Sequence, residues 1–139
     1  MINLFIMRKL IRDTVKIQWR VEQERSRAEK ITTTLTGMPR GSDNHSKVED
    51  GAIRLTDLTD AYKETLGELD RMRGELEPLL CDLSNPDDRA VMRLRYLKGC
   101  SPEDIADAIH RTDRSIYYYL SRAENELVKL HPDKVKSNG

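Results

Sequence analysis

Aromatic residues, cysteine and long apolar runs are all scarce in this chain of 139 residues. Phe, Trp and Tyr make up 5 % of the sequence against 35 % for Asp, Glu, Lys and Arg, which favours a helical bundle over a sheet protein. The two cysteines, Cys81 and Cys100, belong to no close pair of Cys or His, so they indicate neither a disulfide framework nor a zinc site. We expect both to be reduced packing residues, and we expect no cofactor and no metal ion.

The apolar opening stretch, M-I-N-L-F-I-M, covers only residues 1–7 and is followed at once by mixed charge. It is too short for a signal segment, and a membrane-spanning helix needs about 20 apolar residues. We therefore expect a cytoplasmic protein with no membrane partner.

The sequence also lacks the usual constellations of an active site. It contains no Gly-rich loop that could hold phosphate, no Ser with a plausible His and Asp, and no ligands spaced for a metal ion. The 24 acidic residues are scattered over amphipathic segments, where solvated faces are expected. We therefore expect that the protein is not an enzyme.

Net charge is absent too, because 24 basic residues balance 24 acidic ones, so no bulk field draws the chain to nucleic acid. The distribution is uneven: residues 1–35 carry eight basic and four acidic side chains, residues 36–85 six and eleven, and residues 86–131 eight of each. If residues 86–131 alone were to bind nucleic acid, they would need more cations, since phosphate neutralisation supplies much of the affinity of nucleic-acid-binding proteins. Dimerisation, the basic N-terminal segment or a protein partner could supply them.

Hydrophobic periodicity predicts two long helices in residues 1–83, which we expect to form a hairpin that sets the oligomeric state. The first covers about residues 4–35, and we interpret its basic residues as a solvated face, with a phosphate-contacting face as the alternative. Gly, Pro and capping residue types predict a loop at 36–47. A seven-residue apolar repeat over 48–83 predicts a coiled-coil-like seam, which packs on the first helix, forms a dimer, or does both.

Residues 84–131 predict three shorter helices. Asn85 and Pro86 are residue types that begin a helix, and Gly99 suits the C-terminal cap of a helix that starts there. Ser101 and Pro102 begin the next helix in the same way. The polar segment that follows, residues 132–139, predicts a short frayed tail.

The last predicted helix covers residues 113–130 and is capped by Thr112 or Asp113. Apolar residues recur along it at three- and four-residue spacing, which predicts a face turned to the core: Ile116, Leu120, Ala123, Leu127 and Leu130. The turn before this helix contains His110, which would have to adopt a left-handed backbone conformation.

A short capped helix, a turn and a longer capped helix are typical of a helix-turn-helix, which places its second helix in the major groove of DNA. Arg can form two hydrogen bonds to a guanine edge, Ser and Tyr can bond to phosphate or bases, and aromatic faces can contact thymine methyl groups. The candidate DNA-binding residues are Thr112, Asp113, Arg114, Ser115, Tyr117, Tyr118, Ser121 and Arg122. A solvated face on an ordinary helical hairpin is the alternative.

From Asn85 onward the sequence shows several motifs in a fixed order. They are L-R-Y at residues 94–96, Gly99, Ser101, Ile105 with Ala106, Ile116, S-R-A at residues 121–123, and Leu127. In this combination the segment resembles the promoter-reading region 4 of sigma-70-type factors, although that family usually has Gly where this chain has His110. A long helical part joined to such a segment is similar to small phage and prophage regulators of the RinA and ArpU kind.

The resemblance implies an all-α fold in which a long helical hairpin, residues 1–83, precedes a helix-turn-helix domain, residues 84–131. It also implies a transcriptional regulator of phage late genes that acts in a bacterial host cell and binds double-stranded DNA. RNA polymerase is a further expected partner, and we expect a homo-oligomer, with a dimer favoured. A small terminase subunit for DNA packaging and a sigma-like adaptor that binds RNA polymerase remain alternatives.

Overall fold

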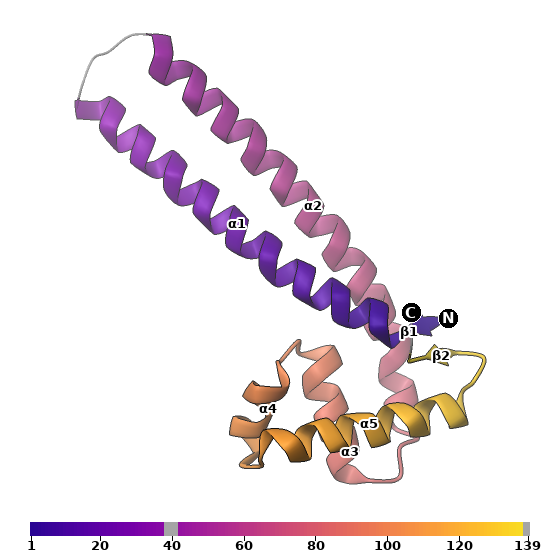
Figure 1. Ribbon diagram of the computed structural model, residues 1–139. Helices are drawn as coiled ribbons and strands as arrows, with labels where there is room; N and C mark the ends of the chain where they lie inside the picture. Colours follow the sequence, from indigo (N-terminus) through magenta and orange to yellow (C-terminus); the bar gives the residue numbers. More distant parts are fainter. Residues whose placement is uncertain (38–41, 138–139) are drawn as a thin grey trace. The chain divides into compact units, whose positions relative to one another are not determined.

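The computed structural model describes residues 1–37 and 42–137, with side chains for 1–29 and 53–137. The fold is all-α apart from one pair of very short strands, as the sequence predicts (Figure 1). The elements in chain order are β1 (Ile2–Asn3), α1 (Leu4–Gly37), α2 (Ser42–Leu80), α3 (Pro86–Met92), the π-helical turn η1 (Arg93–Leu97), α4 (Pro102–Ile109), α5 (Asp113–Leu130) and β2 (Val135–Lys136).

The described chain divides into two compact units. We call the first the head unit, which comprises Met1–Ile11 and Glu68–Gly139. The second, the hairpin unit, comprises Arg12–Gly67. The head unit therefore contains the start of α1 and the last part of α2 as well as all the shorter helices, whereas the predicted domain boundary lay at residue 83.

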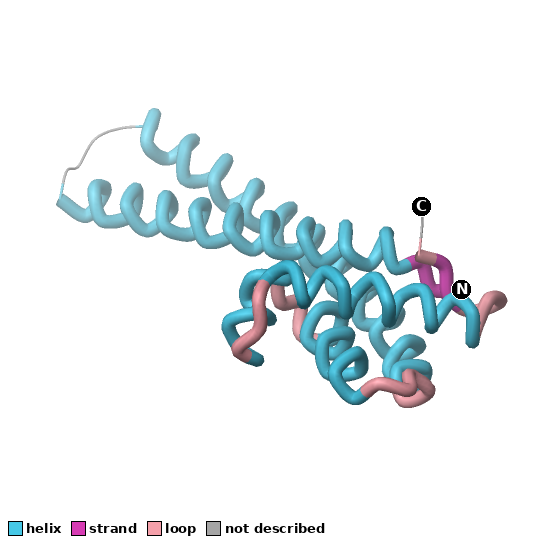
Figure 2. The backbone as a smooth tube through the Cα atoms, turned by 60° about the horizontal axis from the view of Figure 1, so that its bottom comes forward, coloured by secondary structure: helices cyan, strands magenta, loops and turns pink. Residues whose placement is uncertain are grey.

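In the hairpin unit, α1 and α2 run side by side in opposite directions (Figures 1 and 2). Val21 of α1 and Tyr62 of α2 line the same hollow between the two helices. The apolar side chains with which α1 and α2 pack in this unit are only half-buried: Ile17, Val21, Leu55, Leu58, Tyr62 and Leu66. Within residues 12–29 and 53–67 no side chain is fully buried, so this packing leaves much of the apolar seam open to solvent.

The second half of the predicted heptad repeat lies in the head unit instead. Leu69, Met72, Leu76, Leu79 and Leu83 are all buried there. They join one core with Val91 and Met92 of α3, Ile105 of α4 and Ile116 of α5. The repeat was correctly recognised as an apolar face, but its spacing could not reveal that this half belongs to one core with α3, α4 and α5.

The two short strands form a parallel pair, in which Ile2 is opposite Val135 and Asn3 is opposite Lys136. Val135 is only 1 % exposed, and Ile2 donates a backbone hydrogen bond of 2.7 Å to the carbonyl of Lys134. The prediction of a frayed polar tail is therefore wrong as far as residue 137. The tail contains one apolar residue, and burying it beside Ile2 fixes the segment.

Several predicted boundaries need correction. The predicted loop at 36–47 is wrong at both ends, since residues 36–37 belong to α1 and residues 42–47 to α2, while residues 38–41 lie outside the described chain. Ser, Asp and Asn at 42–44 suit the start of a helix as well as a loop. α2 ends at Leu80 rather than 83, and the third helix changes to a π-helical turn after Met92.

Two predicted packing residues are also corrected. Leu130 is 48 % exposed, because α5 reaches its last turn there, and Cys81 is exposed just after the end of α2. No helix of the described chain has the length and apolar character that crossing a membrane requires.

Candidate nucleic-acid interface

The beginning of each helix in the α4–α5 unit is fixed by a side-chain cap. The Ser101 hydroxyl accepts a hydrogen bond of 3.1 Å from the Asp104 amide, and the Thr112 hydroxyl accepts one of 3.2 Å from the Ser115 amide. Pro102 occupies the first helical position, which needs no N–H donor. Thr112, rather than Asp113, is therefore the cap of α5, and the predicted starts of both helices are confirmed.

The turn between α4 and α5 has a left-handed residue, as the sequence predicts. His110 has φ 57° and ψ 48°, and the Arg111 amide donates a 3.0 Å hydrogen bond to the carbonyl of Ala106. A non-glycine residue in this conformation costs roughly 1–2 kcal/mol. The turn keeps this geometry because the helices on either side of it are packed in the core.

Packing of α4 and α5 decides which face of α5 remains outside. Ile105 and Ala106 of α4 are buried together with Ile116, Leu120 and Ala123 of α5. Each fully buried Ile or Leu side chain contributes about 1.5–3 kcal/mol. These contacts hold α5 in one rotational setting, with a fixed set of residues on its opposite side.

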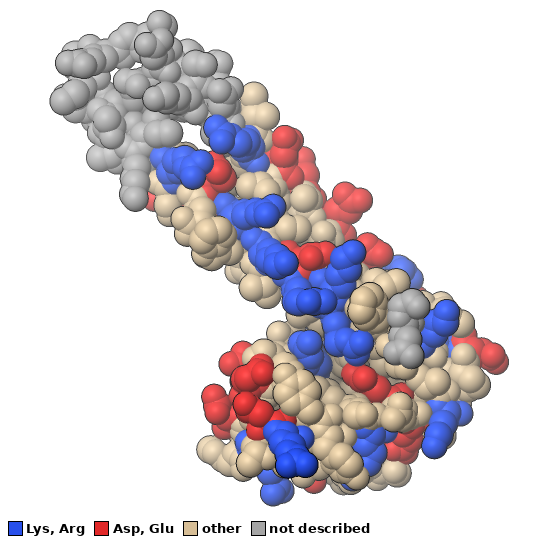
Figure 3. All heavy atoms as spheres, in the orientation of Figure 1, with Lys and Arg blue, Asp and Glu red and all other residues tan. Residues whose placement is uncertain are grey.

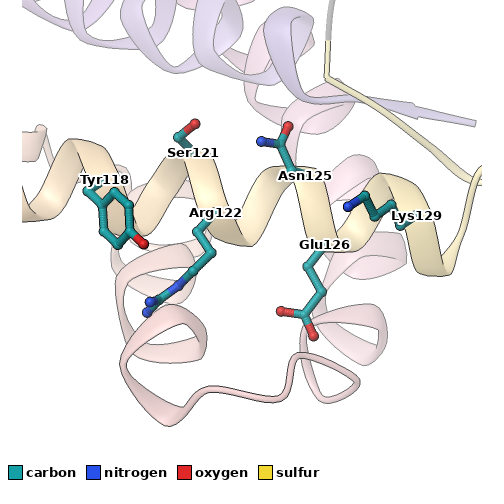
Figure 4. Close-up of a pocket in the computed structure, with 6 residues that line it drawn as sticks. All are labelled: Tyr118, Ser121, Arg122, Asn125, Glu126 and Lys129. Atoms are coloured by element: carbon teal, nitrogen blue, oxygen red, sulfur yellow. The ribbon is translucent and has the colours of Figure 1, made fainter.

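That opposite side carries a row of exposed residues at i, i+4, i+7 and i+11, which we call the α5 ridge: Arg114, Tyr118, Ser121 and Asn125. Tyr118 is 61 % exposed. Figure 4 shows Ser121 and Asn125 projecting from α5 away from α3, with Tyr118 one turn earlier. The candidate residues predicted from the sequence did not include Asn125, although it continues the same helical spacing. The amide side chain of Asn can form two hydrogen bonds to adenine.

Arg122 is a member of the predicted set that the structure places in a different role. Its Nη2 and Nε donate to both carboxylate oxygens of Asp88, at 2.7 Å and 3.0 Å for the shortest contacts, and the Asp88 side chain is 1 % exposed. Hydrogen bonding to Asp88 raises the pKa of the Arg122 guanidinium above its usual value. Arg122 therefore joins α5 to α3, and the two guanidinium nitrogens that could bind a guanine edge already donate to Asp88.

The guanidinium of Arg122 also lies against two aromatic rings. Its central carbon is 5.2 Å from the ring centre of Tyr118 and 5.3 Å from that of Tyr119. The two rings meet edge to face, with centres 6.2 Å apart. This stack holds the Tyr118 side chain in place on the ridge.

Tyr117 lies beside the ridge and points to α4. Its hydroxyl donates a 3.0 Å hydrogen bond to Oε1 of Glu103, and this bond raises the pKa of the phenol. The ring is 53 % exposed. Tyr117 therefore presents an aromatic face to solvent while its hydroxyl is engaged.

The remaining predicted residues lie at the start of α5. Thr112, Asp113 and Arg114 are exposed, whereas Ser115 is half-buried and its hydroxyl lies 2.8 Å from that of Thr112. The structure thus gathers Asp113, Arg114, Tyr117, Tyr118 and Ser121 on one accessible surface. Thr112 and Ser115 form the helix cap instead.

Electrostatics around the ridge are balanced. Arg111 and Arg114 are exposed and form no ion pair among the described residues, but Glu103, Asp104 and Asp107 of α4 are exposed nearby in the same unit. The ridge can therefore offer hydrogen bonds and apolar contacts to a ligand, whereas it supplies little net positive charge.

Comparison with known proteins agrees with this geometry. Residues 85–127 match the family Sigma-70, region 4. No curated protein and no solved structure matches the chain. The matched span begins at the cap of α3 and contains η1, α4 and most of α5, so the chain carries a sigma-70 region 4-like helix-turn-helix.

Region 4 is a DNA-binding regulatory domain rather than an enzymatic one. The match therefore indicates a DNA-binding helix-turn-helix regulator. Among the side chains that the structure describes, no group of three or more His, Cys, Asp or Glu is placed to hold a metal ion.

Proposed function

We propose that this protein is a sequence-specific regulator of transcription that reads the major groove of double-stranded DNA with α5. The observation that carries the proposal is the α5 ridge, which lies opposite the buried face of the second helix in a region 4-like unit. An α-helix fits the major groove, where each base pair presents a distinct pattern of donors, acceptors and methyl groups.

Each accessible side chain of this surface has a role that suits its chemistry. Arg114 can donate two hydrogen bonds to guanine, Asn125 can pair with adenine, and Asp113 can accept from cytosine. The rings of Tyr117 and Tyr118 can contact thymine methyl groups, and Ser121 can bond to phosphate. Thr112, Ser115 and Arg122 set the start and the orientation of α5, and Arg122 is a positioning residue.

Substitution of Arg114 tests the proposal. After a preferred duplex has been selected from random sequences, Arg114→Ala should weaken binding to it by about 5- to 150-fold, which corresponds to roughly 1–3 kcal/mol. Binding to unrelated duplex should change much less. Arg71→Ala is the matched control, because Arg71 is an exposed arginine of α2 that pairs with Glu75. If Arg114→Ala binds the selected duplex as the parent does, α5 does not read it through this residue.

We extend the proposal to the class of regulator. A helical hairpin joined to a region 4-like unit is the arrangement in which the chain resembles phage and prophage regulators of the RinA and ArpU kind, so we propose a late-gene activator in a bacterial host cell. A gene position just before terminase genes, and activation of a promoter that contains the selected site, are the expected results. Activation of no neighbouring promoter would contradict this extension while leaving DNA binding intact.

We also propose that the hairpin unit forms a homodimer. Its apolar side chains are only half-buried, and Val15 and Ile53 are 60 % and 61 % exposed, so a second copy could cover them. Light scattering should then give the mass of two chains. A monomer would refute the dimer, and a ring of eight or more chains would favour the small-terminase alternative.

A sigma-like adaptor that binds RNA polymerase is a second candidate function. The balanced charge of residues 86–131 favours it, because tight DNA binding gains from phosphate neutralisation. Polymerase capture without any salt-dependent binding to DNA would support the adaptor over the regulator.

A further inference from the structure

The hairpin unit carries a row of cations on one face of α1, which we call the cationic stripe: Arg12, Lys16 and Arg20. They follow one another at i and i+4, so they lie on one line of the helix with about 6 Å between successive positions. All three are exposed, and none of them forms an ion pair or hydrogen bond among the described residues. Figure 3 shows Lys and Arg gathered along α1 on the visible face.

The stripe lies away from the side of α1 that packs in the hairpin. Gln18, Val21 and Arg25 face α2, where they line the hollow between the helices. Glu22 lies on another line of the helix. Glu24 follows Arg20 on the same line, at i+4, but its carboxylate pairs with Arg27 at 3.2 Å rather than with the stripe. Among the described residues, the cations of the stripe therefore form no ion pair with their own helix.

Like charges at i and i+4 repel and destabilise a helix. A purely solvated face commonly alternates the two signs, which would stabilise the helix instead. The stripe therefore lowers the stability of α1 unless an anionic partner neutralises it. This repulsion favours a role in binding over the solvated face that the sequence analysis preferred.

Trp19, the only tryptophan of the chain, lies beside the stripe between Lys16 and Arg20 and is 61 % exposed. The acidic residues nearest to the stripe on α1, Asp13 and Glu24, are half-buried, and neither forms an ion pair with the stripe among the described residues. The surface thus combines unneutralised cations with one large amphipathic ring. Because the chain has one tryptophan, tryptophan fluorescence reports on this face of α1.

We infer that the cationic stripe binds the phosphate backbone of duplex DNA as a second, sequence-independent contact. The inference rests on the proposed function, because it assumes that α5 brings the protein to DNA. The α4–α5 unit has balanced charge, whereas phosphate contacts supply much of the affinity of DNA-binding proteins. The stripe offers three cations that the α5 ridge lacks, and phosphates are their complementary partner.

The test is the triple variant Arg12→Ala/Lys16→Ala/Arg20→Ala. Its affinity for the selected duplex and for unrelated duplex should fall by the same factor, and the slope of log K against log salt should become shallower by about 2–3. Alanine is a strong helix former, so α1 should keep its helicity, which circular dichroism checks. The charge-matched control, Lys63→Ala/Lys134→Ala/Lys136→Ala, removes three exposed cations elsewhere and should keep the parental slope.

Trp19 gives an independent measurement on the unaltered protein. Binding to unrelated duplex should protect its fluorescence from acrylamide quenching. An unchanged slope in the triple variant would overturn the inference, as would Trp19 that stays open to quencher on DNA. Protection by anionic vesicles but not by DNA would also overturn it, and so would protection that follows protein concentration without DNA.

These outcomes separate the two proposals. If the triple variant behaves as the parent while Arg114→Ala loses the selected site, the stripe inference fails and the proposed function stands. If Arg114→Ala has no effect while the triple variant weakens binding to every duplex, the stripe binds DNA and the reading role of α5 fails. A parent protein that binds no duplex at all overturns both.

Discussion

The head unit and the hairpin unit differ in how much apolar surface they bury. Every fully buried side chain that the structure describes belongs to the head unit, whereas residues 12–29 and 53–67 of the hairpin have only half-buried and exposed ones. Burial of apolar surface is the main favourable contribution to folding. The head can therefore hold a rigid surface by itself, whereas the hairpin depends on helix propensity, partial burial and any partner that covers it.

The two units also use their charged residues differently. In the head unit, Arg8 donates to the Tyr96 hydroxyl at 2.9 Å, and both groups bond to Glu124, so these charges are satisfied internally. Arg122 and Asp88 do the same. In the hairpin unit the cations of the stripe face outward without such partners. Internal pairs fix the geometry of a reading surface, whereas outward charges suit contact with a polyanion.

Matched core truncations should give the largest difference between the units. Leu76→Ala, at a fully buried position of the head, should lower the free energy of unfolding by about 2–5 kcal/mol because it leaves a cavity. Leu58→Ala, at a half-buried position of the hairpin, should cost about 1 kcal/mol. Urea denaturation followed by circular dichroism measures both. Equal losses of unfolding free energy in the two variants would show that Leu58 is also in a buried core, which a second copy of the chain packed on the hairpin would most simply provide.

Removing the buried carboxylate of α3 should have a smaller effect. Asp88→Ala should lower the free energy of unfolding by about 1.5–3 kcal/mol, because it removes charged hydrogen bonds at a buried site. The exposed neighbour Asp87, which also lies in the first turn of α3, gives the matched control Asp87→Ala. The same Asp88 variant should weaken binding to the selected duplex, since Arg122 and the stacked Tyr118 lose their support. A variant as stable as Asp87→Ala would contradict this account of the pair.

The smallest expected effect concerns pH. Burial raises the pKa of Tyr96 above that of a free tyrosine, with the nearby Glu124 carboxylate as a further cause. The folded head therefore keeps the phenol proton when the unfolded chain releases it. Stability should be fully present below about pH 10 and should fall above it by at most about 1.4 kcal/mol per pH unit.

Tyr96→Phe is the control for this pH dependence. It removes the titrating group but keeps the ring, so its loss of stability above about pH 10 should be shallower than that of the parent. Unfolding curves at a series of pH values measure the difference. Parallel curves for the two proteins would show that other groups cause the alkaline loss.

The local features of the fold were predictable from sequence because their determinants lie within a few residues of one another. The caps at Ser101 and Thr112, Pro102 at the first helical position and the left-handed His110 all follow from the residue types around each helix end. The outward positions of Arg114 and Tyr118 follow from helical spacing and are confirmed as exposed. Whether these residues bind DNA stays a prediction.

The features that sequence reasoning missed join distant segments. Asp88 and Arg122 are 34 positions apart, and Ile2 and Val135 lie near opposite ends of the chain, so no local pattern pairs them. The heptad repeat identified an apolar face on α2, but it could not show that the second half of this face shares one core with α3, α4 and α5. Asn125 differs, because its spacing from Ser121 was visible and was simply not followed one turn further.

The parallel pairing of Ile2 with Val135 also has a consequence for synthesis. Ile2 leaves the ribosome before Val135, and the helices of the hairpin emerge between them. The hairpin can therefore form while the chain is still growing, whereas Ile2, Leu4 and Met7 must wait for most of their neighbours. During that interval these apolar side chains are exposed to chaperones, and the core of the head closes only after β2 has emerged.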